Sequence, residues 1–401
     1  MSSSCLSDSI LAGMVEGNLS DSERQYVSEH VDECAACRGL AAGMVLSVFR
    51  AGQQQHGHPN EKQAAVQETK EPLPPTEIER IGNYRILRKI GEGGMGEVFE
   101  AVHEKIRRRV AIKILRSQYS QNKNIVGRFF NEALAANVIQ HQSLVGIFEA
   151  GFLSTGSAFL IMEYLHGETL FARLQRLGPM NEIAAYLIGR QISSALAAAH
   201  AQEIVHRDLK TENIMLIQDA DVIGGLRAKV LDFGLAKIAV RHQAHAVLTK
   251  DGLTMGTRPY MAPEQWLSAG SVDSKADVYA LGVALFEMLS GRYPFLGPST
   301  SEYMNQHLYE PPSSLASVCT HASAAGAALV AGMLEKKRSM RPSMDQVVAT
   351  IEGILISRRV LAVSPPELRT PSLSAHSLKA QADLDVAQSF LSLNDEDLQF
   401  E

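Results

Sequence analysis

The sequence predicts an α+β chain with two lobes, a small β-rich lobe followed by a larger helical lobe, preceded by a short helical module. Strand-like alternation of apolar and polar residues runs from Tyr84 to about Leu115, and long helical periodicities dominate after Gln140. A break in composition separates residues 1–49 from both lobes. The chain has 401 residues, of which 45% are hydrophobic, enough for a substantial core. A wholly disordered protein is therefore excluded.

The first 49 residues are expected to form short helices, with a linker after them. Ser20 and Glu23 have the spacing of a capping box, and helical periodicity continues to His30. From 50 to 82 the chain is rich in Gln, Pro and other polar residues, with too few large apolar side chains for a core. We therefore expect a flexible linker there.

The β-rich lobe is expected over residues 83–163. Alternating residues flank a glycine cluster, Gly91-Glu-Gly-Gly-Met-Gly96, and a third strand pattern follows at Arg109–Leu115. Strands on both sides of a glycine cluster predict an antiparallel sheet with a tight glycine turn.

The helical lobe is expected over residues 166–356, where Asn181–Ala201 and Asp277–Leu289 carry the clearest helical patterns. Residues 357–401 are rich in Ser and Pro and then acidic, which predicts a disordered tail.

Charge is distributed unevenly along the chain, whose formal net charge is −6. Residues 1–80 contain 6 Lys and Arg against 12 Asp and Glu, residues 364–401 contain 2 against 7, and 30 against 25 lie between them. A mildly basic body with acidic ends does not fit a protein that coats nucleic acid. Four cysteines and no apolar leader argue against a secreted disulfide scaffold. We therefore expect a cytoplasmic protein without a membrane anchor or nucleic-acid partner.

The β-rich lobe contains two features suited to phosphate binding. Gly91, Gly93 and Gly96 would let backbone N–H groups approach phosphate oxygens, although a glycine hairpin is more often a plain turn. Lys113 lies inside an apolar strand, where a cation needs an anionic partner unless it snorkels from the strand edge. Glu132, on a later helical pattern, is either that partner or a solvated helix residue.

The segment His206-Arg-Asp208-Leu-Lys210-Thr-Glu-Asn213, followed by Asp232-Phe-Gly, carries the strongest chemical signal. Asp208 can orient a substrate hydroxyl and accept its proton. Asn213 and Asp232 offer the hard oxygen ligands that Mg²⁺ prefers. Lys210 can offset the charge on a moving phosphoryl group. A purely structural explanation for both segments together is disfavoured.

Six motifs follow one another along the chain in this order: the glycine cluster, Val110-Ala-Ile-Lys113, Glu132, His206-Arg-Asp208, Asp232-Phe-Gly234 and Ala262-Pro-Glu264. In this order they resemble the protein kinase family over about residues 83–356. The resemblance implies the two-lobed protein kinase fold, with ATP and Mg²⁺ or Mn²⁺ as cofactors. It implies transfer of the γ-phosphate of ATP to protein hydroxyls.

The resemblance also implies a role for each matching residue. Lys113 would hold the α- and β-phosphates and pair with Glu132, and Asp208 would be the catalytic base assisted by Lys210. Val98, Ala111 and Met215 would enclose the adenine, while the backbones of Glu163 and Leu165 would bond to it, with Met162 as gatekeeper. The full set implied to bind the nucleotide and its Mg²⁺ is Gly91, Gly93, Gly96, Val98, Ala111, Lys113, Glu163, Leu165, Asn213, Met215 and Asp232.

Lys210 together with Thr257 resembles the serine/threonine-specific pattern. Arg207 resembles the arginine of kinases that are activated when it pairs with a phosphate in the activation segment. The candidates for that phosphate are Thr249 and Thr254, each of which is otherwise an ordinary loop hydroxyl.

The resemblance implies two structural contacts that support the site, and the sequence departs from the family pattern at two positions. Asp277 resembles the buried aspartate that holds the catalytic loop, and Glu264 with Arg341 resembles an ion pair of the helical lobe. Arg258 stands where Pro usually follows the threonine, and the usual Asp-Pro is missing before Arg341. Neither departure removes a catalytic group.

The N-terminal module has the spacing of a metal site. His30, Cys34 and Cys37 would share one helix face, and Cys5 is the natural fourth ligand for a tetrahedral Zn²⁺. The stretch 5–40 resembles the zinc-binding domain of anti-sigma factors, which also precedes some bacterial serine/threonine kinases. A dithiol redox pair and simple packing remain alternatives. Oxidation of zinc thiolates would release the ion, so redox sensing is a hypothesis, as is a regulatory protein partner.

The expected function is therefore that of a bacterial serine/threonine protein kinase, activated by autophosphorylation and acting on protein substrates. One rival is a scaffold in which the zinc module and a pseudokinase bind a transcription regulator without phosphotransfer. Another is a small-molecule kinase, which the segment through Ala262-Pro-Glu264 disfavours. A homodimer and docking of the acidic tail stay open.

Overall fold

The computed structural model describes residues 79–232, 258–267, 272–297 and 299–361, and eight single residues nearer the N-terminus. The chain divides into two units, residues 1–360 and 361–401, and the fold described here belongs to the first. The eight single residues are Ser7, Ile10, Ser22, Glu23, Tyr26, Val27, His30 and Cys34.

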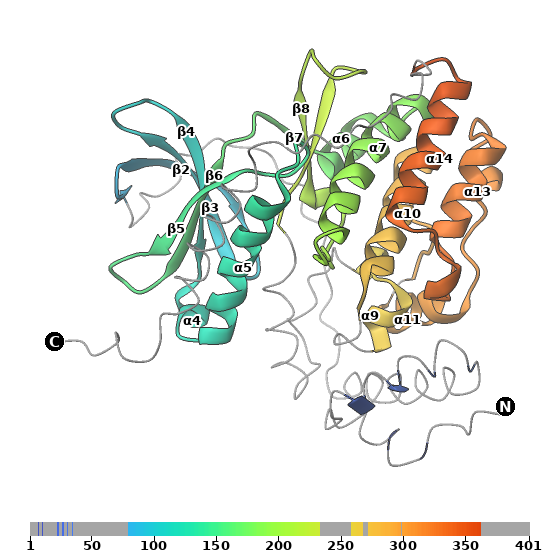
Figure 1. Ribbon diagram of the computed structural model, residues 1–401, viewed down its shortest axis with the longest axis horizontal. Helices are drawn as coiled ribbons and strands as arrows, with labels where there is room; N and C mark the ends of the chain where they lie inside the picture. Colours follow the sequence, from blue (N-terminus) through green and yellow to red (C-terminus); the bar gives the residue numbers. More distant parts are fainter. Residues whose placement is uncertain are drawn as a thin grey trace, which may run out of the picture. The chain divides into compact units, whose positions relative to one another are not determined.

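The β-rich lobe is a six-stranded sheet of order β1-β2-β3-β4-β6-β5 in which all neighbouring strands are antiparallel (Figure 1). The predicted antiparallel sheet is thus confirmed. Its strands are β1 (Arg80–Ile81), β2 (Tyr84–Glu92), β3 (Gly96–His103), β4 (Arg109–Leu115), β5 (Ile147–Phe152) and β6 (Ala158–Glu163).

The alternation of strand β4 explains how the sheet buries both of its faces. Val110, Ile112 and Ile114 point into one apolar cluster with the inner strands. Leu115 belongs to the opposite cluster, which is covered by helix α5 (Lys123–Ile139). Lys113 therefore lies on the α5 side of the sheet.

The larger lobe is helical, as predicted, and α10 (Ser274–Ser290) is its central element. This helix is buried from Ala276 to Leu289 and packs on α7 (Glu182–His200) and α13 (Ala324–Met333) (Figure 1). Asp273 caps its first turn, and Gly291 ends it with φ 73°, a left-handed conformation suited to glycine. The other α-helices in the described part of both lobes are α4 (Ser117–Ser120), α6 (Leu170–Leu177), α9 (Pro263–Leu267), α11 (Thr300–Tyr309), α12 (Leu315–Val318) and α14 (Met344–Ser357).

A second, three-stranded sheet was not predicted. It has the order β7-β8-β9 and consists of β7 (Gly167–Thr169), β8 (Ile214–Gln218) and β9 (Leu226–Val230). The sequence favoured loops in this part of the helical lobe because strands of 3 and 5 residues are too short for a clear alternation. The short helix η1 (Thr211–Asn213) leads directly into β8, and Asp232 follows β9 closely. The small sheet thus places two predicted site segments side by side.

Within the described part of the chain, no helix is both long and apolar enough to span a membrane. The described residues from Ser22 to His30 are helical, in agreement with the helix predicted there.

Candidate active site

The loop His206–Asn213 is fastened to helix α10 by Asp277, as predicted. One carboxylate oxygen of Asp277 accepts the backbone N–H of His206 at 2.8 Å, and the other accepts that of Arg207 at 2.8 Å. His200 adds a third bond, at 2.8 Å from its Nε2. Burial raises the pKa of Asp277, but the bond from His200 and the backbone N–H of His206 outweigh it and leave this pKa below its ordinary value. The anchor is therefore an ionised carboxylate.

His206 joins this loop to the strand that precedes Asp232. Its Nε2 lies 2.9 Å from the carbonyl oxygen of Leu231, and its Nδ1 lies 3.3 Å from the backbone N–H of Asp208. A ring with the proton on Nε2 satisfies both bonds, since it donates through Nε2 and accepts through Nδ1. Arg207 between them has φ 65°, a left-handed conformation that costs energy in a non-glycine residue. The bonds on either side hold it there.

Asp208 and Asn213 are in direct contact. The Asn213 side-chain NH₂ donates to the backbone oxygen of Asp208 at 2.9 Å and to its carboxylate at 3.0 Å. The backbone oxygen of Asn213 accepts the N–H of Leu231 at 2.8 Å. Since both amide hydrogens of Asn213 point at Asp208, its side-chain oxygen is the atom available to a metal ion.

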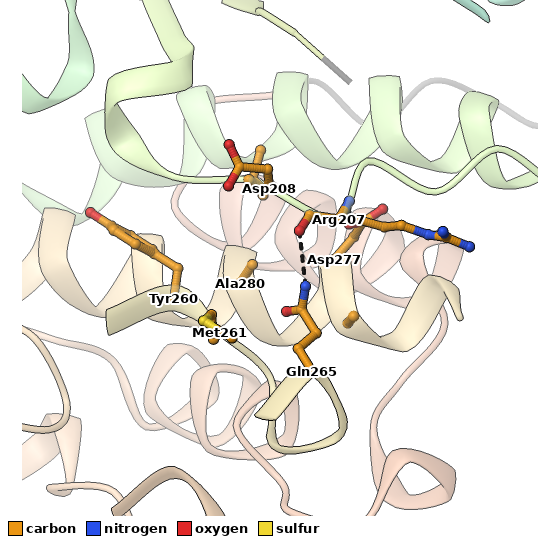
Figure 2. Close-up of a pocket in the computed structure, with 9 residues that line it drawn as sticks. Arg207, Asp208, Tyr260, Met261, Gln265, Asp277 and Ala280 are labelled. Atoms are coloured by element: carbon orange, nitrogen blue, oxygen red, sulfur yellow. Dashed lines mark hydrogen bonds between the residues drawn. The ribbon is translucent and has the colours of Figure 1, made fainter. Parts of the chain in front are cut away.

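A small pocket lies between this loop, η2 (Arg258–Tyr260) and α10 (Figure 2). Gln265 lines this pocket and connects two segments. Its side-chain NH₂ donates to the carbonyl oxygen of Arg207 at 2.9 Å, and its side-chain oxygen accepts the N–H of Ala262 at 3.0 Å. In Figure 2 the Asp208 carboxylate and the Arg207 guanidinium point in different directions from the loop. The residues that line the pocket are Arg207, Asp208, Leu209, Tyr260, Met261, Gln265, Ala276, Asp277 and Ala280.

Lys113 reaches Asp232 from the opposite lobe. The distance from its Nζ to the Asp232 carboxylate is 2.9 Å, and the Lys113 side chain is 13% exposed against 43% for Asp232. Asp232 has φ 44°, again left-handed. The predicted partner Glu132 lies on α5, but its side chain is outside the described part of the structure. The Lys113–Glu132 pair therefore stays a prediction.

The glycine turn between β2 and β3 has no room for a side chain at Gly96. A Cβ atom there would lie 2.3 Å from the backbone oxygen of Ile114 on the neighbouring strand. The turn is closed by the N–H of Gly93, which donates to the carbonyl oxygen of Gly96 at 2.8 Å. Gly91 pairs with Val98 across the two strands.

The structure brings some, but not all, of the predicted adenine-binding residues together. Ala111 and Met162 share one apolar cluster with Val145, against which Val98 also packs. Met215 lies in β8, opposite Thr169 and Lys229, and is not a member of that cluster. Leu165 is half-buried in the connection between β6 and β7.

Glu163 makes a contact that the sequence did not predict. Only its backbone was expected to act, yet its carboxylate accepts Lys229 Nζ at 2.6 Å and the N–H of Gly146 at 2.9 Å. Lys229 also donates to the carbonyl oxygen of Leu144 at 3.1 Å. Since Lys229 belongs to β9 and Glu163 ends β6, this ion pair joins the two sheets.

A pair of arginines forms a second feature that was missed. Burial lowers the pKa of Arg207, and the positive charge of Arg128 on α5 lowers it further, against the charge of Asp277. The Arg207 Nε is buried without a hydrogen-bond partner among the described residues. Two cations that repel each other beside an unused N–H suit an anion. No short motif marks Arg128, which comes near the site only through the fold.

The ion pair expected in the helical lobe is confirmed. Arg341 donates to both carboxylate oxygens of Glu264, at 2.7 and 2.9 Å, and the two side chains are 0% and 4% exposed. Arg341 also donates to three backbone oxygens, those of Glu335, Lys275 and Lys336.

The predicted zinc ligands are described only in part. His30 is buried with its Nε2 lacking a hydrogen-bond partner among the described residues, and its backbone oxygen accepts the N–H of Cys34 at 2.8 Å. Cys5 and Cys37 lie outside the described residues, as do Thr249 and Thr254. The residues that the structure describes contain no group of three metal ligands.

Comparison with known proteins matches residues 84–350 to the protein kinase domain family. The serine/threonine-protein kinase Pkn1 of Myxococcus xanthus is 38% identical over 309 residues, covering 76% of this chain and 42% of that protein. The serine/threonine-protein kinase PknA of Mycobacterium tuberculosis is 37% identical over 238 residues, covering 58% of this chain and 53% of that protein. The chain thus spans about half or less of the length of these relatives.

Proposed function

The chain belongs to the protein kinase family, and from this we propose that it is an ATP-dependent serine/threonine protein kinase in bacterial signalling. One observation carries the proposal: Asp208 and Asn213 are bonded to each other in one loop, and Lys113 contacts Asp232. A scaffold without catalysis has no need of this charged set, so it is not favoured.

The chain's own residues suit each part of the reaction. Asp208, held by Asn213, would orient the substrate hydroxyl and take its proton. Lys113 would hold the phosphates at the glycine turn, and Lys210 would offset the charge on the moving phosphoryl group. The side-chain oxygens of Asn213 and Asp232 fit Mg²⁺, which when bound neutralises charge on the phosphates.

We propose that the adenine lies against Val98 and Ala111, with Met215 closing the opposite side. Supporting this, Val98 and Ala111 pack in one cluster with the predicted gatekeeper Met162. The backbones of Glu163 and Leu165 would then bond to the base, as the family resemblance implies.

Protein substrates and serine/threonine specificity are supported by Lys210 and by the relatives' own names as serine/threonine-protein kinases. To test this, a generic protein substrate is incubated with labelled ATP and Mg²⁺, and its phosphoamino acids are separated. We expect phosphoserine and phosphothreonine from the natural chain and none from Asp208→Asn. Label on tyrosine alone, or equal label from both chains, would overturn the proposal.

Activation by autophosphorylation is supported by the arginine pair. A phosphate on Thr249 or Thr254 would relieve the repulsion between Arg128 and Arg207 and use the Arg207 Nε. Phosphosite mapping by mass spectrometry, beside Arg207→Gln, tests this. Equal activity of the phosphorylated and unphosphorylated chain would contradict it.

We further propose that Cys5, His30, Cys34 and Cys37 bind Zn²⁺. The buried, unbonded Nε2 of His30 supports this, as does the helical bond between His30 and Cys34. Metal analysis of the full chain should give about one zinc per chain and much less for Cys37→Ser. Equal zinc in both would leave the redox or packing alternative. Redox sensing, a regulatory partner, a homodimer and a cytoplasmic location stay predictions.

A further inference from the structure

A buried cluster of hydroxyl groups lies behind the catalytic loop, around the carboxyl of Glu287 on α10. Glu287 is 4% exposed, and the hydroxyl of Tyr260 donates to its Oε2 at 2.5 Å. The hydroxyl oxygen of Thr211 lies 2.7 Å from that of Tyr260 and 3.3 Å from Glu287 Oε2. Thr211 and Tyr260 are 0% and 1% exposed, so water does not compete for these bonds.

The hydrogens of this cluster can be counted. Tyr260 gives its one hydroxyl hydrogen to Glu287 Oε2, and the one hydroxyl hydrogen of Thr211 lies within reach of both the Tyr260 oxygen and the same Oε2. Each of these donors points toward the carboxyl of Glu287, which accepts hydrogen bonds most strongly when it is ionised. Protonation of Glu287 removes this charge and leaves only weaker bonds between neutral groups. Among the described residues the Thr211 hydroxyl bonds only to these two side chains, so the strength with which it is held depends on Glu287.

Both hydroxyl residues lie next to the catalytic groups. Thr211 directly follows Lys210 and begins the short helix that ends at Asn213, whose side chain holds Asp208. Tyr260 ends the helix η2, two residues before Ala262. This chain of bonds thus joins the loop of the predicted base to the segment that follows the predicted phosphosites.

We propose that Thr211 and Tyr260 are positioning residues, which relay the negative charge of Glu287 to the catalytic loop and so hold Asp208 and Asn213 in place for phosphoryl transfer. The proposal rests on the kinase function proposed above. Both hydroxyls are buried behind the loop, so the relay acts only through the loop.

The groups that face Glu287 place its titration near neutral pH. Burial raises its pKa, the bond from Tyr260 lowers it, and the charge of Glu212 raises it again. Bonds from Thr211 and Tyr293 lower it, and the pKa settles at about 7. The relay is therefore strongest above this pH and weakens as the pH falls through it. We expect the transfer rate to fall in the same range.

The first test compares Thr211→Val with the natural full-length chain. Valine keeps the volume of Thr211 and removes its hydroxyl, whereas Thr211→Ser keeps the hydroxyl. At pH 8 we expect kcat to fall about tenfold in Thr211→Val, as for the loss of one buried hydrogen bond, with KM for ATP nearly unchanged. Thr211→Ser should restore most of the rate. Thr350→Val, which removes an exposed hydroxyl on α14, is the matched control and should have no effect.

The second test uses Glu287→Gln, which keeps the size of the side chain and removes its charge. We expect a lower kcat at pH 8, a flat profile of kcat between pH 6 and 8, and a higher Tm than the natural chain at pH 8. The Tm rises because the variant no longer buries a charge. A variant that was merely misfolded would have a lower Tm instead.

Equal kcat and equal pH profiles for the natural chain and Thr211→Val would overturn the relay. A loss confined to KM for the protein substrate would also overturn it, since it would assign the cluster to substrate binding. If the natural chain transfers no phosphate at any pH, the proposed function fails. The relay is then judged by stability alone, and equal Tm values for the natural chain and Glu287→Gln at pH 8 would overturn it.

Discussion

At the scale of single residues, the site depends on charges that their neighbours keep or suppress. Asp277 is fully buried but stays ionised because His200 and two backbone N–H groups bond to it. Lys336 shows the opposite effect. The Lys336 Nζ lies 4.2 Å from the centre of the Phe295 ring. Burial, together with the positive charge of Arg341, lowers the pKa of Lys336 to about 7.

Lys336 gives a prediction for stability against pH. The folded chain releases the Lys336 proton near pH 7, whereas the unfolded chain keeps it up to about 10.5. The unfolded state therefore binds more protons between these values, and the free energy of unfolding rises with pH by up to about 1.4 kcal/mol per pH unit. Urea unfolding from pH 7 to 9 should show this slope, reduced in Lys336→Met. Equal slopes would contradict it.

The sequence identified Asp208, Asn213 and Asp232 because their motifs are local and specific. It could not identify the partners that meet them only in the fold. Glu163 and Lys229 lie 66 residues apart, and Thr211 and Glu287 lie 76 apart. No spacing rule connects positions so distant, so such pairs need the structure.

At the scale of elements, strand registers and helix ends place the site groups. The glycine turn brings β3 so close to β4 that Gly96 has no space for a Cβ atom. Longer elements such as α7 and α10 could be predicted because their periodicity extends over several turns. The strands β7, β8 and β9 could not, since their pairing partners and not their own patterns define them.

Gly96→Ala should therefore raise KM for ATP and destabilise the chain by about 1–3 kcal/mol, because the added Cβ forces the two strands apart. Gly94→Ala, in the same turn, is the matched control, since its Cβ would meet nothing within 4 Å. Nucleotide titration and urea unfolding measure both effects. Equal behaviour of the two variants would show that the close approach at Gly96 is unimportant.

The buried pair of Glu264 and Arg341 joins α9 to the segment before α14. Arg341→Met should lower the free energy of unfolding by about 3–5 kcal/mol, because it leaves the Glu264 carboxylate buried without its partner. Arg358→Met, which removes a half-exposed arginine paired with Glu182, should cost less. Similar costs for both variants would contradict the special importance of the buried pair.

At the scale of the whole molecule, the two lobes meet through charged contacts. Lys113 contacts Asp232, and Lys229 contacts Glu163. These contacts cross between the sheet of the smaller lobe and the region formed by β9 and the residues directly after it. The family resemblance was enough to predict the two lobes, but it did not predict the Lys229–Glu163 bond between them.

Lys229→Met should weaken the contact between the lobes, because it removes the ion pair with Glu163. The lost charged hydrogen bonds predict a free energy of unfolding lower by about 1–3 kcal/mol, and a higher KM for ATP because Glu163 lies beside the proposed adenine site. Arg190→Met is the control, since its pair with Glu352 is far more exposed and should contribute less than about 1 kcal/mol. A KM for ATP equal to that of the control would contradict this role.

The most direct test of the proposed kinase activity is to measure, for the same full-length proteins, the rate of γ-phosphate transfer and the affinity for Mg·ATP. Asp208→Asn keeps the size of the side chain and removes the base. We predict a kcat at least about a hundredfold lower with the Kd for Mg·ATP and the Tm almost unchanged. A variant that transfers phosphate as fast as the natural chain would contradict the assignment of Asp208 as the catalytic base.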